Sequence, residues 1–214
     1  FFEKMKAAII PLVQKISEKQ DFIKRDFLNQ KFSVEKQKKF NQEVASYVGF
    51  DFNKGVIAES AHPFTLNLHN KDVRITTHYM EDNLDSAVFS TIHESGHGIY
   101  EMNIADELTQ TPVGGGTSMG VHESQSRFFE NMIGRSMSFW KGIYNRNIDI
   151  FPLLKKIKLE ELYKEINKVE PSFIRTEADE LTYSLHIMIR YEIEKGIING
   201  EIEIDNLPED WNKK

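Results

Sequence analysis

The 214-residue sequence contains no cysteine. This absence excludes disulfide bonds, thiolate metal ligands and a thiol nucleophile, so a transition-metal site in this chain must be built from histidine and carboxylate side chains. No apolar run approaches the roughly 18 residues of a membrane-spanning helix, and the opening stretch FFEKMKAAIIPL lacks the form of a secretory signal peptide. We therefore expect no membrane partner and a cytoplasmic location.

The chain also lacks an excess of positive charge. Its 27 lysines and arginines are outnumbered by 33 aspartates and glutamates, which gives a formal net charge of −6. Such a balance offers no general electrostatic attraction to nucleic acid, so we expect no nucleic-acid partner. The remaining composition, 40% apolar and 28% charged, is typical of a globular protein that buries a sizeable core.

Helical periodicity dominates the sequence. Apolar residues recur about every 3.6 positions near the start, where Pro11 predicts a kink or the beginning of a second helix. In the next predicted helix, Ser33 is a candidate N-cap and Gly49 a candidate C-terminal stop. Further helices are predicted over about 83–103, 121–144, 159–169 and 176–198.

One short region, residues 59–80, has strand character instead. It contains FTLNLH and VRITTHY, two segments of alternating polarity that flank NKD and so predict a β-hairpin. The glycine-rich TPVGGGTSMG further along lacks the Gly-Lys-Ser/Thr of a phosphate-binding loop and is interpreted as a mobile connection. Together these patterns predict a mainly α fold with one small sheet.

The segment HESGH, residues 93–97, is an HExxH pattern with the spacing of a metal site. On a helix, His93 and His97 are offset by only about 40° around the axis, so both imidazoles can bind one ion. Glu94 lies roughly 60° from His97 on the other side and points beside the ion. This arrangement suits a metal-dependent hydrolase with Glu94 as the general base. The competing interpretation is a pair of histidines on a solvated helix face.

The third metal ligand must come from elsewhere, because no further histidine follows within a few residues of His97. Glu101 is disfavoured, since three ligands on one straight helix rarely converge on one ion. Glu123, in the segment HESQ, lies near the start of the next predicted helix and can approach the ion from a separate element. The neighbouring His122 points about 100° away, and we interpret it as a substrate-binding group or as a support for the ligands.

Five motifs occur in an order that resembles the M32 metallocarboxypeptidases, the Taq-type carboxypeptidases. They are HPF at 62–64, DVRIT at 72–76, HESGH at 93–97, HESQ at 122–125 and IRTEAD at 174–179. The resemblance implies a helical zincin-like fold with one small β-sheet beside the zinc-binding helix. It also implies a protease that removes single residues from peptide C-termini with metal-activated water, and a homodimer for the full-length protein.

The resemblance implies a role for each residue of the metal motifs. His93, His97 and Glu123 are implied as metal ligands and Glu94 as the general base. The expected metal is Zn²⁺, and Co²⁺ is an alternative because ligand sets of this kind accept both.

Substrate-binding residues follow from the same resemblance. Arg175 is implied to bind the C-terminal carboxylate of the substrate, for which a planar guanidinium is well shaped. His62, Asp72 and Arg74 are implied to lie at or near the groove, and His122 is included with them as a candidate substrate-binding residue. From the residues alone, a surface salt bridge is the favoured interpretation of both arginines, for Arg175 with Glu177 or Asp179.

The sequence departs from the family pattern near its end. The family motif Gly-x-x-Gln-Asp-x-His-Trp has no match, and most of the family's N-terminal helical region is absent. We therefore expect residues 1–214 to be a single catalytic-core domain of a longer protein, with the activity of this portion open. The alternatives are another gluzincin-type oligopeptidase or aminopeptidase, or an inactive metal-binding helical fragment.

Overall fold

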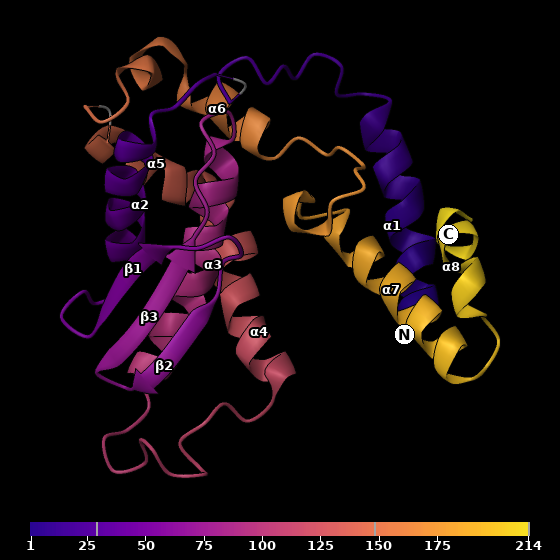
Figure 1. Ribbon diagram of the computed structural model, residues 1–214. Helices are drawn as coiled ribbons and strands as arrows, with labels where there is room; N and C mark the ends of the chain where they lie inside the picture. Colours follow the sequence, from indigo (N-terminus) through magenta and orange to yellow (C-terminus); the bar gives the residue numbers. More distant parts are fainter. Residues whose placement is uncertain (29, 148, 214) are drawn as a thin grey trace. The chain divides into compact units, whose positions relative to one another are not determined.

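The computed structural model describes residues 1–28, 30–147 and 149–213 (Figure 1). These residues form two compact units: the α1/α7 unit, which combines Phe1–Lys24 with Asn167–Lys214, and the sheet unit, Arg25–Ile166. Helices dominate, and one small sheet is present, so the prediction of a mainly α fold with one small sheet is confirmed. Within the described ranges, no helix combines the length and apolar character needed to cross a membrane.

The sheet contains three strands in the order β1-β3-β2: β1 (Gly55–Glu59), β2 (Thr65–His69) and β3 (Asp72–Thr77). Strands β2 and β3 are antiparallel, which confirms the predicted hairpin around NKD. Strand β1 pairs with β3 in parallel and was outside that prediction, because GVIAE is short and shows no regular alternation of polarity. Strand β2 therefore lies at one edge of the sheet, with β3 as its only partner among the described residues.

Helix α3 (Leu84–Met102) packs against one face of this sheet (Figure 1). It begins where the sequence predicts, because the side chain of Asn83 caps it by accepting the backbone N–H of Ser86. Gly98 permits the close packing here: a Cβ at this position would lie 2.7 Å from the ring of Phe50 and 3.3 Å from Ile75 of β3. The sheet thus holds α3, which carries the HESGH segment, at a fixed distance.

A second layer covers the other side of α3. It includes α2 (Val34–Val48), which ends at Gly49 in the left-handed conformation (φ 107°) as predicted, together with α5 (Met137–Asn147) and α6 (Leu159–Ile166). Their buried side chains form one core with those of α3, including Phe40, Val44, Val88, Ile92, Phe139, Trp140, Ile143 and Leu162. This core fixes the orientation of α3 about its own axis.

The single helix predicted over 121–144 is wrong in detail. The structure has α4 (Met119–Arg127), a π-helical segment η1 (Phe128–Gly134) and then α5. The break occurs because the hydroxyl of Ser136 accepts the backbone N–H of Phe139 and starts a new helix. A π-helical segment shifts the direction of the side chains that it carries, and such segments are frequent at functional sites.

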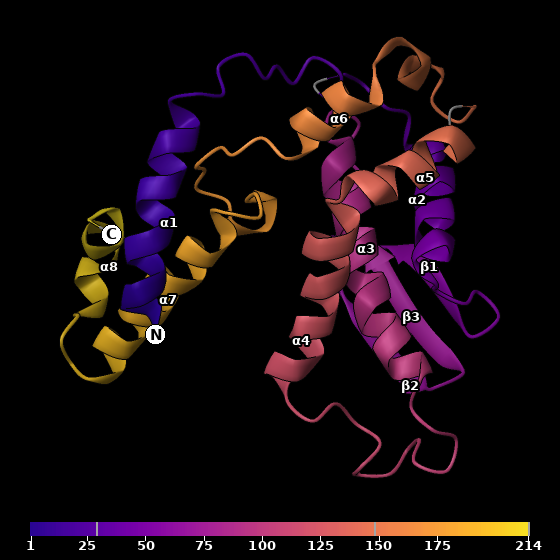
Figure 2. The same cartoon turned by 180° about the vertical axis from the view of Figure 1, so that it is seen from behind.

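The α1/α7 unit consists of α1 (Phe2–Ser17), α7 (Tyr183–Ile198), α8 (Leu207–Asn212) and short 3-10 turns; Figure 2 shows the same helices from behind. Helix α1 continues through Pro11, so no second helix begins there. Helix α7 starts later than the predicted residue 176, because Asp179 accepts the backbone N–H groups of Leu181 and Thr182 and so interrupts the helix.

Candidate metal centre

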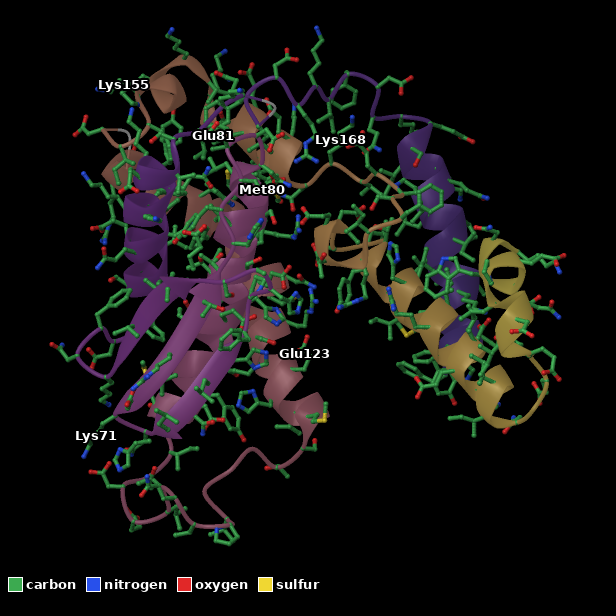
Figure 3. The ribbon with its side chains drawn as sticks, viewed as in Figure 1. Lys71, Met80, Glu81, Glu123, Lys155 and Lys168 are labelled. Carbon is green, nitrogen blue, oxygen red and sulfur yellow. The ribbon has the colours of Figure 1, made fainter. Side chains whose placement is uncertain are left out.

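His93 and His97 lie on α3. Glu123 lies on the neighbouring α4 and is labelled in Figure 3. One ligand atom from each residue falls within 4.8 Å of the other two. The Oε2 atom of Glu123 is 3.1 Å from Nε2 of His97 and 3.6 Å from Nε2 of His93. Donor atoms that each lie about 2.1 Å from a tetrahedral ion are separated by about 3.4 Å, so this spacing fits a small divalent metal.

The approach of α4 to α3 depends on Gly96, which lies between the two histidines. A Cβ on Gly96 would lie only 2.7 Å from Cα of Ser126, the third residue after Glu123. Because Gly96 has no side chain, α4 packs closely against α3, and Glu123 lies near the two histidines.

A second carboxylate, that of Glu130, binds His93 on the side of the ring that faces away from Glu123. Oε2 of Glu130 is 2.8 Å from Nδ1 of His93, which leaves Nε2 directed toward Glu123. Arg127 joins the two carboxylates, because its Nη1 donates to Glu130 over 2.8 Å and its Nε donates to Glu123 over 3.4 Å. Carboxylates that bind the second ring nitrogen of a metal-binding histidine fix the ring orientation.

These contacts change the pKa values of the groups. Burial would lower the pKa of His93, but hydrogen bonds to Glu123 and Glu130 raise it to about 9. Burial would raise the pKa of Glu123, but its bonds to His93 and His97 lower it far more. Glu130 behaves in the same way: burial opposes ionisation, while His93 and Arg127 hold its pKa below the ordinary value. The site therefore favours ionised carboxylates beside the imidazoles.

His97 has a different supporting group. Its Nδ1 lies 2.5 Å from Nδ1 of His122, and Nε2 of His122 lies 2.5 Å from Oε1 of Glu101. Glu101 also accepts a hydrogen bond of 2.6 Å from the side chain of Asn67 on β2. Glu101 therefore binds His122 and is not in the group of converging ligand atoms, which agrees with the prediction that disfavours it as a ligand.

Glu94 lies on the same turn of α3, with its side chain nearly buried. The hydroxyl of Thr65, on the edge strand β2, donates to Oε2 of Glu94 over 2.6 Å. The same hydroxyl lies 3.1 Å from the backbone oxygen of Glu94. Among the described residues, the Oε1 atom makes no hydrogen bond. One carboxylate oxygen is therefore held by the sheet, and the other is available to a proton.

The sequence profile of the family described as "Carboxypeptidase Taq (M32) metallopeptidase" matches residues 1–214. The chain belongs to this M32 family. The family implies a divalent metal, and the three converging donor atoms provide nitrogen and oxygen ligands at suitable spacing for one.

Individual carboxypeptidases are similar over all or most of the chain. Carboxypeptidase 1 of Bacillus subtilis is 46% identical over 214 residues, which are 100% of this chain and 43% of the relative. Thermostable carboxypeptidase 1 of Thermus thermophilus is 44% identical over 187 residues, 87% of this chain and 37% of the relative. The chain thus spans less than half the length of these relatives.

Solved M32 structures have the same fold over this portion. The M32 carboxypeptidase from Deinococcus radiodurans R1 gives a TM-score of 0.93 at 40% identity, covering 98% of this chain and 42% of the other. The Pyrococcus furiosus carboxypeptidase structure gives 0.92 at 39% identity, covering 99% and 43%. This fold is therefore shared with the corresponding portion of these M32 carboxypeptidase structures.

The structure does not bring Arg74 or His62 into the ligand group. On β3, Val73 and Ile75 are fully buried toward α3, and alternation directs Arg74 to the opposite, exposed face. There Arg74 forms a two-pronged ion pair with Asp72, at 2.9 and 3.0 Å. His62 is exposed in the connection between β1 and β2, and its backbone oxygen accepts from Ser60.

Arg175 lies in the α1/α7 unit, in the 3-10 turn Arg175–Glu177. Its Nη1 donates to the hydroxyl of Tyr183 over 2.8 Å, and its guanidinium lies 5.8 Å from the centre of that ring. From the residues alone, the alternative for Arg175 is a salt bridge to Glu177 or Asp179. In the structure, the carboxylate of Asp179 accepts the backbone N–H groups of Leu181 and Thr182, just before α7 begins. The substrate-binding role of Arg175 stays a prediction.

Proposed function

We propose that this chain carries the metal centre and general base of a metal-dependent carboxypeptidase, which removes single residues from peptide C-termini. One observation carries the proposal: donor atoms of His93, His97 and Glu123 converge within 4.8 Å beside the nearly buried Glu94. Membership of the M32 family and the carboxypeptidase names of its relatives support the same reaction class. A single catalytic-core domain over 1–214 stays part of the proposal.

In this proposal, His93, His97 and Glu123 hold the metal. The expected ion is Zn²⁺, with Co²⁺ as the alternative, because two imidazoles and one carboxylate suit both. A divalent ion bound there supplies Lewis-acid polarisation of the peptide carbonyl and lowers the pKa of water.

Glu94 moves the proton. Thr65 donates to its Oε2 atom, so Oε1 is the atom that accepts the proton from water. The same carboxyl group then delivers the proton to the nitrogen of the departing amino acid. Protonation makes this amine a good leaving group. Because the hydroxyl of Thr65 holds the carboxylate in one orientation, little reorganisation is needed between the two steps.

Arg175 is proposed to bind the free carboxylate of the substrate. Its guanidinium has five N–H donors, and one bond to Tyr183 leaves others able to bind a carboxylate in a two-pronged geometry. His62 and Arg74 are retained as weaker candidates for the groove. The exposed position of Arg74 and its ion pair with Asp72 favour a structural role for that residue.

A matched pair of peptides tests the proposal. The two peptides have the same sequence, but one ends in a free carboxylate and the other in an amide. Each is incubated with the metal-loaded chain, once without chelator and once with it. We expect loss of single residues from the free peptide, resistance of the amidated peptide and no hydrolysis with chelator. Equal cleavage of both would favour an oligopeptidase, and shortening from the N-terminus would favour an aminopeptidase. Metal binding without hydrolysis of either peptide would favour an inactive metal-binding fragment.

Two further properties follow from the family resemblance. We propose that the full-length protein is a homodimer and acts in the cytoplasm. Sedimentation of the full-length protein at micromolar concentration tests the dimer, and fractionation of cells tests the location. A monomer, or recovery outside the cytoplasm, would contradict the respective proposal.

A further inference from the structure

We infer that His122 and Glu101 are positioning residues, which hold the ring of His97 in the one tautomer that can bind a metal through Nε2. The inference rests on the proposed metal site. It does not depend on peptide hydrolysis, because it concerns how tightly the chain binds a metal ion.

The hydrogen positions follow from the two short contacts. Nε2 of His97 faces the ligand group, 3.1 Å from Glu123, so the ring hydrogen of a metal-binding His97 must be on Nδ1. That N–H donates to Nδ1 of His122 over 2.5 Å, and Nδ1 of His122 is therefore an acceptor. The hydrogen of His122 then lies on Nε2, where it donates over 2.5 Å to Glu101, whose ionised carboxylate can only accept.

The carboxylate of Glu101 determines which atom donates in each of the two hydrogen bonds that link His97, His122 and Glu101. Glu101 is 6% exposed and is held from the other side by the amide of Asn67, so it has little freedom to turn away. Since a carboxylate requires a donor, it selects the Nε2–H form of His122, and that form in turn selects the Nδ1–H form of His97. The same result is reached for His93 by a direct bond to Glu130.

His122 is too well enclosed to serve as a free substrate-binding group. Both of its ring nitrogens are occupied. Its ring centroid lies 4.7 Å from that of His97 and 4.6 Å from that of Tyr100. The glycine-rich connection covers another side, because a Cβ on Gly116 would lie 2.8 Å from Cδ2 of His122. Gly116 thus lets the backbone pack against the ring and keep it in place.

Two substitutions of His122 distinguish its role in orienting His97 by hydrogen bonds from a role in filling space alone. His122→Phe keeps a planar ring but removes both hydrogen bonds. His122→Gln replaces the ring with an amide, whose oxygen can accept from His97 and whose nitrogen can donate to Glu101. His69→Gln is the control, because His69 lies at the end of β2 and its Nδ1 accepts the backbone N–H of Lys71.

The measurement is the dissociation constant of Zn²⁺ alone, by competition with a chelator, and the visible spectrum of the Co²⁺-loaded chain. We expect His122→Phe to bind Zn²⁺ about 10–100-fold more weakly and to change the Co²⁺ spectrum, while His122→Gln recovers most of the affinity. His69→Gln should bind as the unsubstituted chain does. Unchanged Zn²⁺ affinity in His122→Phe would overturn the inference.

Tautomers can be measured even if a variant fails to fold. Nitrogen-15 NMR of the unsubstituted metal-free chain, at a pH where the imidazoles are neutral, should show the hydrogen of His97 on Nδ1 and that of His122 on Nε2. The opposite assignment would overturn the inference. In a metal-saturated active enzyme, a raised KM in His122→Gln with unchanged Zn²⁺ affinity would likewise overturn it in favour of substrate binding. Absence of hydrolysis would count against the proposed function alone.

Discussion

The hydroxyl of Thr65, on the edge strand of the sheet, donates to Oε2 of Glu94 over 2.6 Å. This bond joins the sheet to the helix that carries both histidines. It fixes which oxygen of the proposed general base stays free. Because Glu94 is nearly buried, its carboxylate has few other ways of being held in place.

The first prediction concerns this bond. Thr65→Val removes the hydroxyl but keeps the branched shape of the side chain. We expect kcat on a peptide with a free C-terminus to fall about 10-fold, which is the effect of losing one modest hydrogen bond that stabilises the transition state. Zn²⁺ affinity should be unchanged, because Thr65 does not contact the ligand group. Thr65→Ser keeps the hydroxyl and serves as the control. A kcat in Thr65→Val equal to that in Thr65→Ser would show that the bond has no role in catalysis.

The second prediction concerns Glu94 itself. Glu94→Gln keeps the size of the side chain but cannot take up a proton, so kcat should fall about 10²–10⁴-fold. The variant should still bind one metal ion with unchanged affinity, measured by the metal content of the dialysed protein. Full activity in Glu94→Gln would remove this residue from the mechanism, whereas loss of the metal would make it a ligand.

The third prediction concerns the packing of α4 on α3. Gly96→Ala places a Cβ about 2.7 Å from the backbone of Ser126, so α4 must shift; we expect destabilisation of about 1–3 kcal/mol and weaker Zn²⁺ binding through displacement of Glu123. Thermal unfolding and metal titration measure the two effects. Gly115→Ala is the control, because a Cβ there has no neighbour within 4 Å. Equal behaviour of the two variants would show that α4 accommodates the methyl group.

The fourth prediction concerns pH and the α1/α7 unit. Burial, together with the positive charges of Arg190 and Arg175, lowers the pKa of His186 on α7 below its ordinary value of 6.5. The unfolded chain then takes up the proton more readily than the folded chain. Stability contributed by neutral His186 is therefore present above pH 6.5 and is lost as pH falls through the lower folded pKa.

Hydrogen exchange of the α7 amides, corrected for intrinsic rates, checks this prediction at pH 7.5 and 5.5. The unsubstituted chain should lose protection at the lower pH, and His186→Gln should lose less, because glutamine does not titrate. An equal loss in both proteins would assign the pH dependence to other groups.

Much of the site could be predicted from the sequence because it depends on helical spacing. The four-residue separation of His93 and His97 places them on one face of α3, and the structure has that helix within one residue of the predicted bounds. The position of Glu123 on a separate predicted helix makes it the predicted third ligand, and in the structure its oxygen lies close to the two histidine nitrogens.

The supporting residues could not be predicted in the same way. Thr65 and Glu130 are 29 and 37 residues away in sequence from the side chains that they hold, and their approach depends on strand register and on the π-helical segment. The only local signal for Glu130 was its position three residues after Arg127, a spacing that suits an ion pair on a helix. The bond between His97 and His122 likewise depends on how closely α4 packs at Gly96.

The central claim is that His93, His97 and Glu123 bind one catalytic metal ion, with a fourth position open. An anomalous difference map from a crystal of the Zn²⁺-loaded chain, recorded at the zinc absorption edge, tests it directly. We expect one strong peak bonded to Nε2 of each histidine and to the carboxylate of Glu123, with no fourth protein ligand. A peak elsewhere, or a fourth side chain closing the coordination shell, would contradict it.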